Sequence, residues 1–149
     1  NIVVTDVVDE PLKLAKTLGA NEIFNVGSDT EIIKKYSKNK GWFDTMFECS
    51  GSELALMGAV ATIKPKGVVV QLGMSGNMRI PMQFITTKEI QLVGSFRFHE
   101  EFYDGVQCIS SGIIDVEPLI SHSFPLANAE LAFETANDRS NSMKVQITF

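Results

Sequence analysis

Short runs of apolar, often β-branched residues recur along the chain at nearly even intervals. They centre near residues 4, 24, 46, 70 and 92, so that successive centres lie 20 to 24 residues apart. Stretches with the apolar spacing of helices separate these runs. Buried strands that alternate with helices are typical of a parallel sheet with crossover connections. The pattern therefore predicts an α/β fold with a doubly wound parallel sheet.

The segment between the first two runs carries the clearest helix signals. Leu14 and Leu18 lie four residues apart, and Pro11 suits a first helical turn. Asp9 can cap the N-terminus of this helix, and Gly19 fits the stop at its C-terminus. Weaker patterns predict two further helices, at residues 32–36 and 54–61. The Pro-Lys-Gly sequence at residues 65–67 is expected to interrupt regular secondary structure after the second of them.

The alternation changes after about residue 98. The predicted elements beyond it are a helix that ends at Gly112, a strand, a second helix and a last strand, at residues 100–111, 119–124, 129–136 and 144–149. The two strands do not extend the earlier rhythm. We therefore assign residues 1–98 to one domain and residues 99–149 to a C-terminal segment that belongs to another structural unit.

Composition and charge narrow the classes of function. Hydrophobic residues make up 44% of the 149 residues and charged residues 21%, which is typical of a globular domain that buries its own core. The formal net charge is -5, and no basic stripe is present, so nucleic acid is not an expected partner. An anionic dinucleotide is compatible with this charge, because backbone N–H groups and helix N-termini can bind its phosphates.

The cysteines and histidines do not form a motif. Cys49 and Cys108 belong to no Cys-x-x-Cys or Cys/His cluster, and His99 and His122 are not spaced for a metal site. We therefore expect structural or surface histidines and a reducing, cytoplasmic compartment. No apolar run approaches the roughly 20 residues of a membrane span, and no signal peptide is visible, so no membrane partner is expected.

Asp6 is the first candidate binding residue, because it follows the apolar run of Ile2 to Val4. In a dinucleotide-binding fold, an acid at this strand end accepts hydrogen bonds from the adenine ribose. An aspartate of an ordinary turn or cap is the alternative. The glycine-rich phosphate loop should precede such an acid by about 20 residues, but only five residues precede Asp6. Since the chain also opens directly on an apolar run, we expect further residues upstream.

Three later strand ends carry further candidates. Small or flexible residues follow the third and fourth runs, at residues 48–51 and 72–74, where ligands bind in open α/β sheets. Arg97 lies between Phe96 and Phe98 directly after the fifth run. Ordinary turns and an exposed arginine are the alternative interpretations, and each signal is weak by itself.

Taken together, these segments carry a resemblance to a known family. The succession VVTD, LAKTLGA, FDTMFECSG, VVVQLG, KEIQLVGSFRF and KVQIT resembles the second part of zinc-dependent medium-chain dehydrogenases, in particular those that act on polyols and sugar acids, such as the sorbitol dehydrogenases. The resemblance implies a Rossmann-type unit without its first strand and phosphate loop, followed by a segment that returns toward a catalytic domain outside this chain. It also implies NAD, a zinc ion held outside this chain, and a homodimer or tetramer.

The resemblance implies roles for individual residues as well. Cofactor contacts fall to Asp6, Cys49, Leu72, Gly73, Met74, Phe96 and Arg97. The substrate is expected at Arg97 and Phe98. Sorbitol dehydrogenases often carry tyrosine where this chain has Phe98, and a basic residue where it has Pro11, so oxidation of a sugar acid such as L-idonate to 5-ketogluconate is favoured. The family's catalytic residues and metal ligands have no counterpart in this chain, and the chain alone is expected to be inactive.

Two other classes of function remain open on the residues alone. A methyltransferase dependent on S-adenosylmethionine also binds a ribose with an acid at the end of a strand. A non-catalytic interaction module could instead pair its exposed sheet edge with a partner. For the dehydrogenase, we expect homodimers formed by the segment at residues 78–82 and the strand at residues 91–95.

Overall fold

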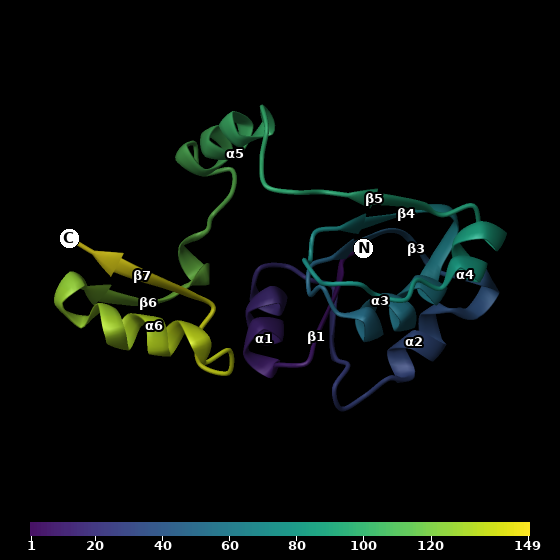
Figure 1. The fold of residues 1–149 in the computed structure, drawn as a ribbon, viewed down its shortest axis with the longest axis horizontal. Helices are drawn as coiled ribbons and strands as arrows, with labels where there is room; N and C mark the ends of the chain where they lie inside the picture. The colour runs from purple at the N-terminus through teal and green to yellow at the C-terminus, as the bar shows by residue number, and fades with distance from the viewer. The chain divides into compact units, whose positions relative to one another are not determined.

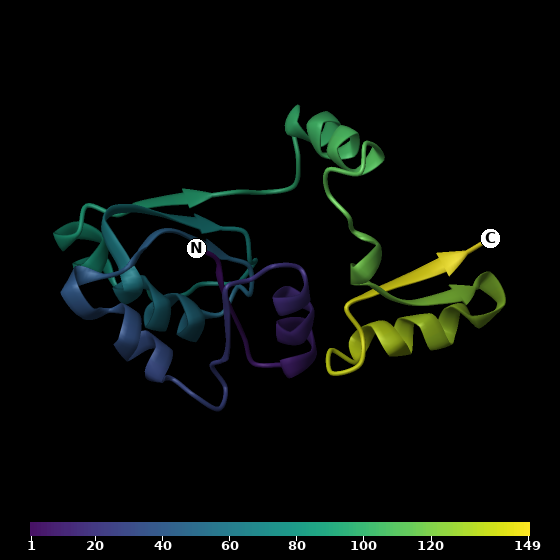
Figure 2. The ribbon, with the colours of Figure 1, turned by 180° about the vertical axis from the view of Figure 1, so that it is seen from behind.

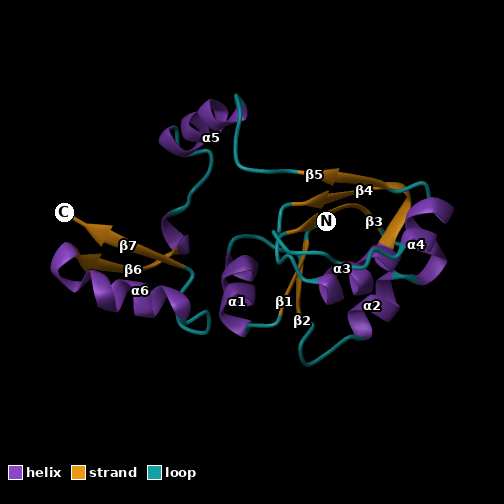
Figure 3. Cartoon of the chain, viewed as in Figure 1, coloured by secondary structure: helices purple, strands orange, loops and turns teal.

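A computed structural model describes residues 1–149 and shows helices alternating with parallel strands (Figures 1 and 3). The chain divides into two compact units. One consists of residues 30–98, and the other combines residues 1–29 with residues 99–149. Figure 2 shows the same ribbon from behind, with the C-terminal strands and helix in yellow and yellow-green. No helix has both the length and the apolar character needed to cross a membrane.

The unit of residues 30–98 is built on a parallel sheet with the strand order β3, β4, β5. The strands are β3 (Phe43–Glu48), β4 (Ile63–Gln71) and β5 (Gln91–Gly94), and the helices are α2 (Glu31–Tyr36), α3 (Glu53–Ala59) and α4 (Met82–Thr87). The register pairs Glu48 with Gln71 and Gln71 with Gly94. The last residues of all three strands therefore lie side by side at one edge of the sheet.

The core of this unit packs against the sheet, from the start of β4 at Ile63 to Val69 near its other end. Its buried residues come from α3, from the short helix η2 (Val60–Thr62), from β4 and from the approach to β5, and they are Leu56, Val60, Ile63, Val69 and Ile90. Phe43, Met46, Met78 and Ile85 pack against this cluster. Removal of these side chains from water is the main stabilising contribution to the unit.

The other unit contains two pairs of parallel strands. The elements of the first pair are β1 (Val3–Asp6), α1 (Asp9–Thr17) and β2 (Glu22–Asn25), and those of the second are β6 (Ile120–Pro125), α6 (Ala129–Asn137) and β7 (Lys144–Thr148). Helix α5 (Glu101–Ser110) precedes the second pair. Strands β6 and β7 pair with each other in a separate two-stranded sheet. The assignment of residues 1–98 to a single domain stays a prediction.

Most of the elements predicted from the sequence are present. The five apolar runs coincide with β1 to β5, and the helices predicted near α1, α2, α3, α5 and α6 form. Gly19 and Gly112 follow helix ends with φ angles of 106° and 74°, which L-residues with side chains rarely adopt.

Two local predictions are wrong. Asp9 is the first residue of α1 instead of its cap, and its side chain accepts a hydrogen bond from the Asn25 side chain at 2.5 Å. The break expected at residues 65–67 is absent, because β4 continues through these residues with a shift in register and a φ of 64° at Lys66. A bulge therefore absorbs the Pro-Lys-Gly sequence without ending the strand. Helix α4 was not predicted.

Candidate functional site

The carboxyl edge of the three-stranded sheet carries an open pocket of about 370 Å³, lined by Leu72, Met74, Ser95, Phe96 and Arg97. These residues come from the loops that follow β4 and β5. In open parallel sheets, the carboxyl ends of the strands are where ligands bind. The structure thus brings together four of the residues that the sequence singled out for cofactor or substrate, and it adds Ser95, which was predicted only as part of the dimer contact.

Apolar side chains around the pocket are exposed. Met74 is 77% exposed and Phe96 is 59% exposed, and Leu72 is also open to solvent. Large apolar side chains gathered at one concave place are typical of a surface that binds a ligand or partner. The pocket is therefore suited to a partly apolar group.

Arg97 supplies the positive charge of the pocket. Its φ angle is 59°, in the left-handed region, which is uncommon for a residue with a side chain. Its guanidinium carbon lies 4.9 Å from the centroid of the Phe96 ring, a distance at which a cation and an aromatic face attract each other. Phe98 is exposed and is not among the residues that line the pocket.

Two glycines allow the loops after β3 and β4 to touch through their backbones. A Cβ atom on Gly73 would lie 2.0 Å from the backbone nitrogen of Gly51. A Cβ atom on Gly51, whose φ is 67°, would lie 2.3 Å from the carbonyl oxygen of Met74. Any side chain at either position would push the loops apart, so the contact requires glycine at both.

Glu48 joins these loops with a buried carboxylate. Its Oε1 accepts hydrogen bonds from the backbone and hydroxyl of Ser50, and its Oε2 accepts from the backbone of Gly51 and from the Gln71 amide. Burial raises the pKa of Glu48, but these four hydrogen bonds outweigh burial and hold it below its usual value. The carboxylate therefore stays ionised at neutral pH.

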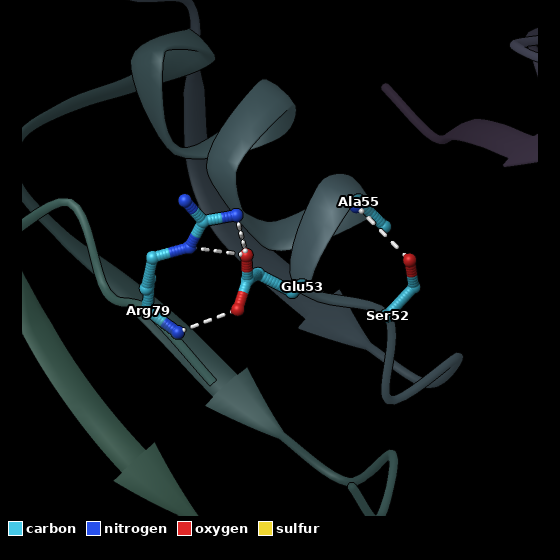
Figure 4. A network of polar contacts seen from close by, with 4 residues as sticks. All are labelled: Ser52, Glu53, Ala55 and Arg79. Carbon is cyan, nitrogen blue, oxygen red and sulfur yellow. Dashed lines mark hydrogen bonds and ion pairs between the residues drawn. The ribbon is translucent and has the colours of Figure 1, made fainter. Parts of the chain in front are cut away.

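An ion pair between Arg79 and Glu53 connects the loop after β4 with the first turn of helix α3 (Figure 4). The Glu53 carboxylate accepts hydrogen bonds from the Arg79 backbone at 2.7 Å and from its Nε at 2.7 Å. Ser52 caps the same helix, since its hydroxyl oxygen accepts a hydrogen bond from the Ala55 backbone at 3.4 Å. Because Arg79 is exposed, the pair adds little to stability, and its geometry mainly restricts the path of the loop.

Cys49 is exposed at the end of β3 and does not line the pocket. Partial burial and the neighbouring Glu48 charge both raise the pKa of its thiol. A protonated thiol is a poorer nucleophile than a thiolate, so these surroundings do not activate Cys49.

Asp6 belongs to the other compact unit, where it ends β1. Its Oδ1 accepts hydrogen bonds from the backbone N–H groups of Val7 at 2.7 Å and Val8 at 3.0 Å. This is the geometry of the turn aspartate that the sequence left open as an alternative. The same geometry fixes the carboxylate and leaves Oδ2 as an acceptor for a hydroxyl group, so it also fits a ribose.

The structure offers no metal site. No group of three or more His, Cys, Asp and Glu side chains is arranged to hold a metal ion. His122 instead stacks on Phe124, with ring centroids 6.1 Å apart, and its ring nitrogen lies 3.1 Å from the Ser121 hydroxyl. The residues present therefore do not fit a zinc ion.

Sequence comparison places these features in a family. The family described as zinc-binding dehydrogenase matches residues 1–111. L-idonate 5-dehydrogenase (NAD(P)(+)) of Escherichia coli is 37% identical over 149 residues, which cover 99% of this chain and 43% of that protein. Sorbitol dehydrogenase of Arabidopsis thaliana is 36% identical over 154 residues, covering 97% of this chain and 42% of the relative. The chain thus spans less than half the length of these relatives.

Solved structures show the same fold. The crystal structure of L-idonate 5-dehydrogenase from Escherichia coli K-12 matches with a TM-score of 0.93 and covers 100% of this chain and 43% of that chain. An Escherichia coli alcohol dehydrogenase in complex with NADH matches with a TM-score of 0.89 at 27% identity, covering 100% of this chain and 44% of the other.

Proposed function

The chain belongs to the zinc-binding dehydrogenase family, and on this basis we propose that it forms the cofactor-binding part of an enzyme that oxidises a sugar acid or polyol with NAD. The observation that carries the proposal is the pocket lined by Leu72, Met74, Ser95, Phe96 and Arg97 at the carboxyl edge of a parallel sheet. These 149 residues cover 43% of the related L-idonate 5-dehydrogenase, so the activity that we propose is that of a longer enzyme.

The residues of the pocket suit the nicotinamide end of NAD. The apolar side chains of Leu72, Met74 and Phe96 can cover a flat ring, and the loop backbones offer polar groups beside it. NAD, when bound, accepts a hydride from the substrate carbon. Gly73 keeps the loop backbone free of side-chain bulk next to the pocket, and Cys49 lies one residue after Glu48 at the same strand edge.

Asp6 would bind the adenosine ribose of NAD through Oδ2, since Oδ1 is held by two backbone N–H groups. Its negative charge would repel the 2′-phosphate of NADP. Pro11 stands where related enzymes often carry a basic residue, so that position supplies no charge to balance this phosphate. We therefore propose that NAD is preferred.

Arg97 and Phe98 are the residues that we assign to the substrate. A guanidinium group donates paired hydrogen bonds to a carboxylate, which favours a sugar acid over a neutral polyol. Phe98 lacks a hydroxyl group with which to bind a polyol. L-idonate, oxidised to 5-ketogluconate, is the substrate that we propose. The zinc ion implied by the family would be held by residues outside this chain.

A homodimer or tetramer formed through β5 is part of the same proposal. The strand order makes β5 an edge strand, and its Leu92 and Val93 are exposed. An open apolar edge of this kind favours pairing with a second copy of the chain. The segment at residues 78–82, which leads into α4, is the second surface that we assign to this contact.

The test of the proposed cofactor is a fluorescence titration of the full-length protein that contains this chain. We expect NADH fluorescence to increase on binding, a weaker response to NADPH, and no binding of S-adenosylmethionine. Asp6→Ala should reduce the difference in affinity between NADH and NADPH. Equal affinity for the two cofactors in the unmutated protein would contradict the role of Asp6, and binding of S-adenosylmethionine instead would identify a methyltransferase.

Asp115→Ala is the matched control for this titration. Asp115 also holds a turn, since its carboxylate accepts a hydrogen bond from the backbone of Glu117 at 3.0 Å. It lies outside the proposed site, so its replacement should leave both affinities unchanged. Binding of none of the three ligands by the unmutated protein would favour the interaction module.

A further inference from the structure

Gln71 connects the ends of all three strands of the sheet. Its side-chain amide donates hydrogen bonds to the Glu48 carboxylate and, at 2.9 Å, to the carbonyl oxygen of Gly73. Its backbone carbonyl oxygen accepts a hydrogen bond from the backbone N–H of Ser95 at 3.0 Å. One residue therefore links the end of β3, the loop after β4 and the loop after β5.

The orientation of the Gln71 amide is fixed by its two acceptors. Turning the group over would direct its oxygen at the Glu48 carboxylate and at the Gly73 carbonyl, both of which need a donor. In the orientation that is left, Oε1 is buried without a hydrogen-bond partner in the protein. A buried acceptor without a donor lowers stability, so stability alone does not explain an amide at this position.

Glu48 completes the connection from the side of β3. Besides its side-chain contacts, its carbonyl oxygen accepts hydrogen bonds from the backbones of Leu72 and Gly73, both at 2.8 Å. Gly51 and Gly73 touch with no side chain between them. The separation of the loops is thus set by hydrogen bonds to Glu48 and Gln71. We call Glu48, Gly51, Gln71 and Gly73 the strand-end clasp.

We propose that Glu48 and Gln71 are positioning residues, which set the affinity of the pocket for its nicotinamide cofactor by fixing the loops that carry Leu72, Met74 and Ser95. This inference rests on the proposed function and deepens it. Neither side chain lines the pocket, so both act through the backbone of the clasp. A site whose loops are held in the binding geometry before the ligand arrives binds more tightly, because less order is lost on binding.

The first test is Gln71→Met in the full-length protein, with NADH binding measured by fluorescence and stability by denaturant unfolding. Methionine has a similar length but donates no hydrogen bond, and it also removes the buried acceptor. We expect the Kd for NADH to rise about 10-fold while the unfolding midpoint changes little. Gln83→Met makes the same substitution at an exposed position of α4 and should change neither quantity.

The second test is the pH profile of NADH binding by Gln71→Glu. This variant places a second carboxylate beside Glu48. When two carboxylates share a site, repulsion between their charges raises the pKa of one of them. Repulsion should open the clasp at neutral pH, and protonation should close it again as the pH falls toward about 5. Affinity for NADH should therefore recover at the lower pH in this variant and not in the unmutated protein.

The two tests separate this inference from the proposed function. If the unmutated protein does not bind NADH, the proposed function fails and the inference fails with it. If it binds NADH and Gln71→Met binds equally well, only the inference is overturned. If Gln71→Met loses stability and affinity together, a pH-dependent recovery in Gln71→Glu supports positioning, and a flat profile contradicts it.

Discussion

The two edges of the three-stranded sheet are stabilised in opposite ways. At the amino edge, the strands begin in an apolar core, where Ile63 is 1% exposed and Ile90 is 6% exposed. At the carboxyl edge, buried polar groups of Glu48 and Gln71 connect the strands, while the apolar side chains of Leu72 and Met74 face solvent. The core residues Ile63 and Ile90 at the amino edge are buried, whereas Leu72 and Met74 at the carboxyl edge are exposed.

One charged residue at the amino edge, Lys88, binds the backbone there with its side chain. Lys88 is buried, and its ammonium group donates hydrogen bonds to the carbonyl oxygens of Ala61 at 2.7 Å and Ile63 at 2.8 Å. Burial lowers the pKa of this lysine. Through these two contacts the Lys88 side chain connects the turn before β5 with the backbone at the start of β4, which stabilises this edge.

The difference shows how one small sheet can combine stability with binding. If apolar packing ordered the carboxyl edge, the side chains that could cover a cofactor ring would be buried against one another. Hydrogen bonds from the clasp instead order the loops and leave those side chains accessible. Substitutions at the amino edge should therefore lower stability, and substitutions at the carboxyl edge should lower affinity.

The largest effect is expected for Ile63→Ala at the amino edge. The substitution leaves a cavity in the core cluster and should lower the free energy of unfolding by about 2–5 kcal/mol. Denaturant unfolding of the full-length protein measures this loss. NADH affinity of the folded fraction should not change, and a large rise in Kd would show that the two edges are not separate.

Gly73→Ala should have the next largest effect, on binding. Its Cβ would lie 2.0 Å from the Gly51 backbone nitrogen, so the two loops must separate. Because small displacements of a binding site can lower affinity strongly, we expect the Kd for NADH to rise about 100-fold in a titration. Gly76→Ala, in the same loop, has open space around the added Cβ and should bind NADH normally. Equal effects in the two variants would contradict the importance of the backbone contact.

Arg97→Ala should have a smaller effect, on catalysis. Loss of the guanidinium group should lower kcat/KM for L-idonate by about 10-fold to 100-fold, or roughly 1.4–2.7 kcal/mol of transition-state interaction. Steady-state kinetics of the full-length enzyme measure this change, and unfolding should show that stability is kept. Unchanged kinetics in a folded variant would remove Arg97 from the site.

The sheet could be predicted from the sequence because each strand is a local apolar run with turn residues after it. The pocket could be located for the same reason, since the residues after the runs that become β4 and β5 meet at one edge of a parallel sheet. Helix α4 was missed because its six residues, MQFITT, are too few to display a helical period and include β-branched residues.

The clasp could not be predicted in the same way. It depends on the register that sets Glu48 opposite Gln71, and register is a property of strand pairing that one strand does not reveal. The only sequence signal is a polar residue at the end of each of two apolar runs, FDTMFE and VVVQ. The burial of Lys88 could not be predicted from the sequence either, because a lysine in a turn is usually exposed.

The most direct test of the contrast between the two edges is amide hydrogen exchange of the full-length protein with and without NADH. Binding should raise protection at the carboxyl edge, at the hydrogen-bonded amides of Gly51, Leu72, Gly73 and Ser95. Protection should stay constant at the amino edge, at the amides of Trp42, Lys66 and Ile90. Protection that rises equally at both edges, or only at the amino edge, would contradict the assignment of the carboxyl edge as the cofactor site.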